Sequence, residues 1–99
     1  MGRPTKLSDV EIRDRLGTVP GWSLIDGKLR REFKFARFVE AFGFMSSLAL
    51  VAEKIDHHPE WSNVYNRVVI ELQTHDANGI TELDFELATA ANRLAENAS

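Results

Sequence analysis

Residues 28–55 read KLRREFKFARFVEAFGFMSSLALVAEKI, and the spacing of their apolar residues changes partway along. In the first part, charged residues 30, 32 and 34 alternate with the apolar residues Leu29, Phe33 and Phe35. This alternation predicts a strand with one buried face from about Lys28 to Phe35. From about Ala36 to Ile55 apolar residues recur at steps of three and four, which predicts an amphipathic helix packed on a sheet.

Two features of this stretch depart from the simple pattern. Arg31 falls on the apolar face of the strand, which indicates an edge position or a partner at that point. Further apolar residues widen the helical stripe, so we expect this helix to be the most buried one: Phe42, Phe44, Leu50 and Val51. Phe44 lies off the main stripe and can alternatively sit at a subunit contact.

The segment before this stretch predicts a short helix and a first strand. Ser8 and Glu11 have the spacing of a capping box, and Gly17 is a plausible helix terminator. Residues 19–21 predict a turn. A strand then begins near Trp22 and ends at Asp26-Gly27, a strong two-residue hairpin signal.

The segment after it predicts two more strands and a last helix. Pro59 ends the central helix, because the residue before a proline avoids helical angles. Residues 61–65 and 67–74 have the pattern of extended chain, and residues 75–79 that of a loop. The last helix begins near Thr81, with residues 97–99 frayed. The sequence therefore predicts a single α+β domain over residues 1–99, with the order α-β-β-α-β-β-α and its helices on one face of a small antiparallel sheet.

Composition excludes several classes of protein. The 99 residues are 43% hydrophobic and 27% charged and contain no cysteine, so disulfides and thiol chemistry are excluded. The net charge of −3 and the scattered basic residues argue against nucleic-acid binding. The sequence has neither an apolar run of the ~20 residues that a membrane helix needs nor a secretory signal at Met1, so we expect no membrane association and a cytoplasmic location.

The candidate chemistry lies in three histidines, His57, His58 and His75, which fall within nineteen residues of one another. If the last strand runs back beside residues 61–65, all three can meet at one edge of the sheet. Imidazole both donates and accepts protons near neutral pH, which suits a reaction that needs an acid and a base. Nearby carboxylates can fix the imidazole tautomers, and aromatic residues offer a surface for a flat ligand: Glu53, Asp56, Asp84, Trp61 and Tyr65.

Each of these residues has a structural alternative. A histidine at the end of a helix often serves only the helix dipole, and Trp61 can be a core anchor. Asp84 follows Thr81 by three residues and can simply complete a capping box. Three histidines with a carboxylate can also bind zinc or iron. Adjacent histidines rarely converge on one ion, so the spacing favours acid/base use over metal binding.

The stretch from Glu53 to Asp84 resembles the pterin-4a-carbinolamine dehydratase family. The family signature is an acidic residue, a histidine pair with proline, an aromatic residue, a later histidine and an aspartate. All of these are present at the family's spacing: Glu53, His57, His58, Pro59, Tyr65, His75 and Asp84. The likeness extends, less strongly, over nearly the whole chain.

The resemblance implies a fold and a reaction. The family has a four-stranded antiparallel sheet with three helices and assembles into dimers or tetramers. It removes water from a 4a-hydroxy-tetrahydropterin to give the quinonoid dihydropterin in tetrahydrobiopterin recycling, without a metal or cofactor. The implied site has His57 and His75 as the acid/base pair and His58 orienting the pterin substrate. Its supporting residues are the carboxylates Glu53 and Asp84, Trp61 as an apolar wall, and Asp56 as a further partner.

The resemblance also implies an alternative function. Some members of the family are dimerisation cofactors for a homeodomain transcription factor and use their helices rather than the histidine site. A protein-interaction module is therefore the main alternative to an enzyme. The intact set of histidines with Glu53 and Asp84 favours the enzyme, because a scaffold has no physical need for that combination.

Overall fold

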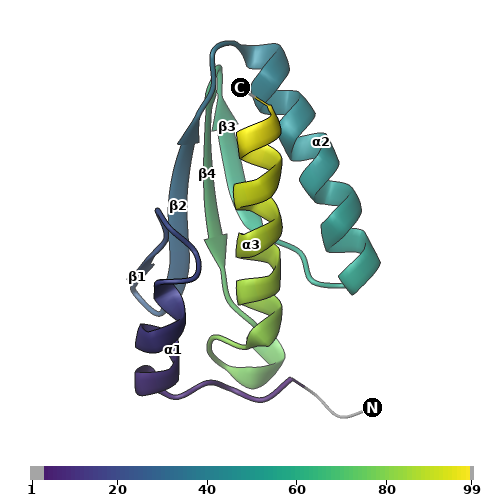
Figure 1. Ribbon diagram of the computed structural model, residues 1–99. Coiled ribbons are helices and arrows are strands. Elements are labelled where there is room, and N and C mark those ends of the chain that lie inside the picture. The colour runs from purple at the N-terminus through teal and green to yellow at the C-terminus, as the bar shows by residue number, and fades with distance from the viewer. Residues whose placement is uncertain (1–3, 99) are drawn as a thin grey trace.

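The computed structural model describes residues 4–98 and confirms the predicted order of elements. Figure 1 shows the helices and strands in chain order. Their bounds are α1 Asp9–Leu16, β1 Ser23–Ile25, β2 Lys28–Lys34, α2 Phe38–Ile55, β3 Glu60–Val64, β4 Arg67–Leu72, a short 3-10 turn at His75–Ala77, and α3 Glu82–Asn97.

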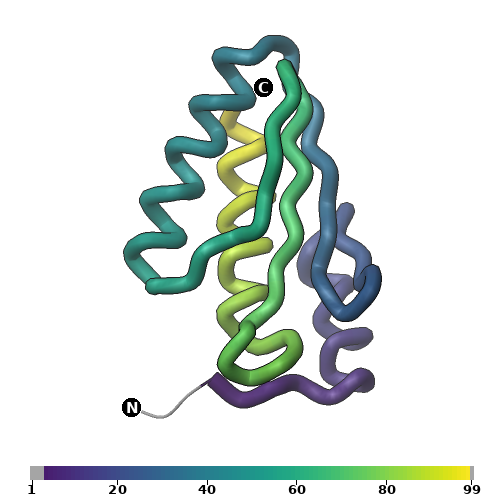
Figure 2. Tube along the Cα trace, turned by 180° about the vertical axis from the view of Figure 1, so that it is seen from behind, coloured from purple at the N-terminus to yellow at the C-terminus, as the bar shows by residue number. Residues whose placement is uncertain are grey.

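The four strands form one antiparallel sheet in the order β1-β2-β4-β3. The predicted α+β class is therefore confirmed, with α2 and α3 side by side over the sheet (Figure 1). Figure 2, seen from behind, shows the strands in front of α3. The register pairs Phe33 with Val68 and Trp61 with Ile70, so these four side chains share the face of the sheet that the helices cover.

The core lies between this face and the two long helices. Leu29, Ile70 and Leu72 from the sheet are fully buried, as are Leu48 and Leu87 from the helices. The local signals at the helix starts are also confirmed, since α1 and α3 both begin with a capping box. The last helix includes Asn97, the first of the three residues expected to fray, and ends there, while Ser99 lies outside the described residues.

One expectation about α2 is confirmed and another is wrong. Phe44 belongs to the buried face, with only 2% of its surface exposed, and packs on Phe33 with ring centroids 4.9 Å apart, so it is not at a subunit contact. The helix is not the most buried one. It packs with one stripe against α3 and the sheet, while its outer side exposes Phe42 and Leu50, the latter by 74%.

Arg31 lies at a local edge of the sheet, as expected, although β2 as a whole lies between β1 and β4. The strand β1 is short and pairs only with residues 28–30, so it ends before it reaches Arg31. Arg31 finds its contacts within the chain instead, at Pro20 and Asn92. Over residues 4–98, every helix is too short or too polar to cross a bilayer.

Candidate functional site

The histidine pair follows the C-terminal end of α2. Asp56 adopts a left-handed conformation, with φ 53° and ψ 45°, and its N–H donates to the carbonyl oxygens of Ala52 and Glu53. The N–H of His57 also donates to Ala52 O, at 3.0 Å. This cap turns the chain sharply out of the helix. His57 therefore points inward and is buried, while His58 is exposed.

The third histidine, His75, follows the C-terminal end of β4. Thr74 and Gly79 form an isolated bridge, with the N–H of Thr74 donating to Gly79 O at 2.8 Å, and the 3-10 turn that begins at His75 lies between them. Because β4 runs antiparallel to β3, its end lies beside residues 57–60. All three histidines then line one cavity of about 740 Å³, together with Ile55, Asp56, Gln73, Thr74, Asp76, Leu83, Glu82 and Pro4.

Asp84 lies behind the cavity and forms hydrogen bonds with two of the residues that line it, His57 and Thr74. It is fully buried, and its Oδ1 lies 2.6 Å from Nε2 of His57. Its Oδ2 accepts from the Thr74 hydroxyl at 2.8 Å and from the Thr81 N–H at 2.9 Å. The Thr74 hydroxyl proton is committed to Asp84. The 2.7 Å contact between the two threonine hydroxyls is therefore donated by Thr81, which accepts in turn from the Leu83 N–H.

This network fixes the tautomer of His57. A buried carboxylate needs donors on both oxygens, and on Oδ1 the donor is Nε2–H of His57. In the neutral imidazole the lone pair then lies on Nδ1, which can accept a proton. Asp84 thus does both things that its position in the sequence allowed, because it completes the capping box of α3 and holds His57.

The other two histidines face carboxylates at the surface. Nε2 of His58 lies 2.8 Å from Glu53 Oε1, and both side chains are mostly exposed. Nε2 of His75 lies 3.5 Å from Glu60 Oε1. Each of the three imidazoles therefore has a carboxylate of its own, rather than sharing a common point with the other two.

Glu60 is the residue that sequence reasoning missed. Its Oε2 accepts from Lys28 Nζ at 2.8 Å and its Oε1 from Gln73 Nε2 at 3.2 Å. The hydrogen bond from Lys28 and then that from Gln73 lower the pKa of Glu60 below its ordinary value. The sequence placed Glu60 two residues after His58, but its contact with His75 depends on the register between β3 and β4.

The remaining predicted residues differ in how close they lie to the cavity. Asp56 lines the cavity, while Glu53 reaches it through His58. Trp61 is half-buried and packs against the hydrophobic core. Tyr65 lies at the turn between β3 and β4, at the end of the strands opposite to His75. Among residues 4–98, no three histidine, aspartate or glutamate side chains come together as a metal ion requires.

Comparison with known proteins identifies the family. Residues 5–94 match the family described as Pterin 4 alpha carbinolamine dehydratase. Two relatives assigned as pterin-4-alpha-carbinolamine dehydratases are similar over nearly their whole length. The one from Solibacter usitatus (strain Ellin6076) is 56% identical over 92% of this chain and 96% of its own. The one from Prochlorococcus marinus (strain MIT 9303) is 59% identical over 91% and 94%.

A solved structure agrees with both. The crystal structure of a transcriptional coactivator/pterin dehydratase from Brucella melitensis superposes with a TM-score of 0.89 at 48% identity, covering 92% of this chain and 99% of that one. The capping boxes, the sheet order and the histidine cavity thus occur in a chain that belongs to the pterin-4a-carbinolamine dehydratase family.

Proposed function

We propose that this chain removes water from a 4a-hydroxy-tetrahydropterin and that its histidines are the acid and base. The observation that carries the proposal is the cavity of about 740 Å³, lined by three imidazoles that each contact a separate carboxylate. The names of the relatives support the same reaction. A cavity of this size lies within the range of ~300 to ~1,000 Å³ that is usual for small-molecule sites.

The reaction needs two proton transfers. Hydroxide is a poor leaving group, so an acid protonates the hydroxyl on C4a and the C–O bond breaks to release water. The lone pair of N5 assists this departure. A base removes the proton of N5 as the double bond between C4a and N5 forms, which gives the quinonoid dihydropterin. The product then serves tetrahydrobiopterin recycling.

The environments of the histidines suggest their roles. His57 is held by Asp84 in one tautomer, so it presents a defined nitrogen to the substrate. His75 is mostly exposed and lies 3.5 Å from Glu60, so it can exchange protons with water between turnovers. We assign the acid/base pair to these two residues. His58, paired with Glu53, orients the pterin.

The test is the dehydration of enzymatically generated 4a-hydroxy-tetrahydropterin, followed by absorbance. His57→Ala and His75→Ala should each lower the rate by roughly two to four powers of ten, the usual contribution of general acid/base catalysis. Arg93→Ala, on an exposed position of α3, is the control and should leave the rate unchanged. Unchanged turnover in a folded double variant of both histidines would refute the assignment.

A second candidate function rests on the outer face of α2. Phe38, Val39, Phe42 and Leu50 are 49–74% exposed there, and the rings of Phe38 and Phe42 lie 5.7 Å apart. At 100° per residue these side chains fall within about 120° of one another on the helix. Exposed apolar patches of this kind commonly mark protein interfaces. The Brucella melitensis protein is described as a transcriptional coactivator as well as a pterin dehydratase, which supports a partner-binding role.

We propose that a second copy of this chain covers that face, giving a homodimer or homotetramer. Phe42→Glu should lower the molar mass measured by light scattering, and Glu86→Gln on the exposed side of α3 is the control. An unchanged mass in the Phe42 variant would contradict self-association through α2. A protein partner that wild type and the triple histidine-to-alanine variant both capture, and that the Phe42 variant does not, would instead support the coactivator role.

A further inference from the structure

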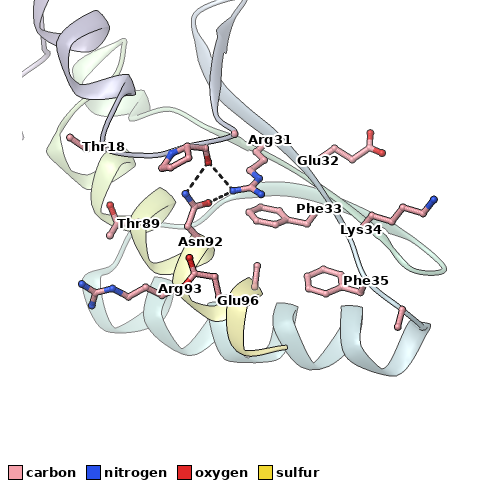
Figure 3. A pocket seen from close by; sticks show the side chains of 14 residues that line it. Thr18, Arg31, Glu32, Phe33, Lys34, Phe35, Thr89, Asn92, Arg93 and Glu96 are labelled. Carbon is pink, nitrogen blue, oxygen red and sulfur yellow. Dashed lines mark hydrogen bonds between the residues drawn. The ribbon is translucent and has the colours of Figure 1, made fainter. Parts of the chain in front are cut away.

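A second cavity lies away from the histidine site, between β2 and the C-terminal half of α3 (Figure 3). Its volume is about 660 Å³. Asn92, on its wall, follows Asp84 by eight residues of α3, which places the two about 12 Å apart along the helix. The central polar group of this cavity is the guanidinium of Arg31, the one charged side chain of β2 on the buried face of the sheet.

Packing fixes the guanidinium in place. Its Cζ lies 4.3 Å from the centroid of the Phe33 ring, a cation–π contact. Gly21 lies close against the same group, because a Cβ at this glycine would come within 2.6 Å of Cζ, 2.7 Å of Nε and 2.8 Å of Nη1. Gly21 also has φ +88°, a region that side chains disfavour. A side chain at position 21 would therefore clash with the guanidinium of Arg31.

Hydrogen bonds fix one end of the same group. Nη1 of Arg31 donates to Pro20 O at 2.8 Å and to Asn92 Oδ1 at 2.7 Å. Asn92 is itself held, since its Nδ2 donates to Pro20 O at 3.0 Å and its Oδ1 accepts from Trp22 Nε1 at 2.8 Å. The dashed lines at Arg31 and Asn92 in Figure 3 mark hydrogen bonds of this network. The guanidinium is thus pre-organised, with little freedom left to lose on binding.

The remaining edge of the guanidinium has no partner. Within residues 4–98, no hydrogen bond engages Nε or Nη2 of Arg31, and no carboxylate pairs with it. Arg15 and Arg37, by contrast, each bind a glutamate through two hydrogen bonds. Burial lowers the pKa of Arg31, so its charge has lost part of its solvation without gaining an anion.

We propose that this cavity binds a small organic oxyanion, a carboxylate or a phosphate ester, through the Nε–Nη2 edge of Arg31. That edge presents two parallel N–H groups, the geometry that binds an oxyanion with two hydrogen bonds. Phe35 and Ala95 line the cavity and contact the apolar body of the ligand. At the rim, Lys34 and Arg93 extend away from Arg31, and Glu96 adds a carboxylate (Figure 3). Glu32, also at the rim, faces Arg67 at 3.7 Å. The site is separate from the histidine cavity and does not depend on its chemistry.

The probes are phenylacetate, its uncharged analogue phenylacetamide, and inorganic phosphate. Each is titrated into the full chain while two side-chain signals are followed by NMR: Nε–H of Arg31 and Nε1–H of Trp22, which donates to Asn92 in the same network and remains in every Arg31 variant. We expect saturable shifts with phenylacetate or phosphate at a Kd below roughly 10 mM and none with phenylacetamide. The tighter of the two anions identifies the source of the oxyanion. Equal responses to phenylacetate and phenylacetamide, or no response to either anion, would overturn the proposal.

Three variants locate the effect. Arg31→Met keeps an apolar chain over Phe33 and should weaken anion binding by tenfold or more, the usual effect of losing a charge-assisted hydrogen bond. Arg31→Lys keeps the charge but loses the paired N–H groups, so it should also bind more weakly. Arg30→Met is the matched control, because Arg30 is the neighbour on the opposite face and has Glu71 at 3.8 Å. If Arg31→Met fails to fold, Arg31→Lys decides, and wild-type affinity in Arg31→Lys would overturn the proposal.

Discussion

Replacing Asp84 by Asn should reverse the tautomer of His57 while leaving the shape of the site intact. The N–H of Thr81 can only donate, and it points at Oδ2 of Asp84 from 2.9 Å. The Asn carbonyl oxygen must therefore take the Oδ2 position, which puts the amide NH2 at the Oδ1 position, 2.6 Å from His57 Nε2 in the wild type. Two donors cannot face each other, so the imidazole proton moves to Nδ1 and the lone pair turns inward.

The loss can be estimated from the contacts of Asp84. The change removes the charge from a fully buried acceptor of three hydrogen bonds. Hydrogen bonds to charged groups contribute about 1.5–3 kcal/mol each, but the amide keeps most of the contacts, so we expect a net loss of about 1–3 kcal/mol. For a domain of this size that lowers Tm by roughly 5–20 °C. Presenting the wrong nitrogen should lower kcat by roughly two to four powers of ten.

Two measurements separate the outcomes. Long-range ¹H–¹⁵N spectra report which nitrogen of His57 carries the proton, and the absorbance assay reports kcat in the same sample. Glu53→Gln is the matched control for Tm and for the tautomer of His57 but not for kcat, because its pair with His58 is mostly exposed and such pairs contribute little to stability. A folded Asp84→Asn variant that keeps the proton on Nε2 and turns over like wild type would refute the reasoning.

Three further predictions concern single positions. Gly21→Ala should lower Tm more than Gly27→Ala, because both glycines have positive φ but a Cβ has open space only at Gly27; equal losses would contradict the fit around the arginine. Glu60→Gln should be destabilising near neutral pH and not near pH 3. The Lys28 hydrogen bond lowers the pKa of Glu60, so its contribution is present above the unfolded pKa of about 4.3 and is lost as pH falls through the lowered value. Chemical denaturation at both pH values tests this, and a constant difference would count against it. Asp56→Gly should keep or raise Tm, since φ 53° suits glycine; a fall in kcat without a fall in Tm would show that the Asp56 carboxylate acts in the reaction.

The sequence located much of the candidate site because the relevant signals are local. The three histidines, the stop at Pro59 and the loop after residue 74 are visible as residue types at fixed spacing. The pairing of β3 with β4 then brings the predicted histidines to one cavity. Glu60 was missed because its carboxylate on β3 meets His75 after the neighbouring strand β4, and no short-range pattern marks that contact.

The alternation and the three- and four-residue spacing determined the element types, because they follow the direction of successive side chains along a strand or helix. The capping boxes determined the starts of α1 and α3, because their hydrogen bonds join residues three apart. Tertiary structure alone decided which groups meet. His57 and Asp84 are 27 residues apart in the chain, and Arg31 and Asn92 are 61 apart. It also decided that one side of α2 is exposed, although the sequence is apolar around most of that helix. The physical reason is that burial and pairing depend on how distant segments pack. A helix with apolar residues on two sides buries only one of them against its own fold, and a second surface is needed to cover the other side.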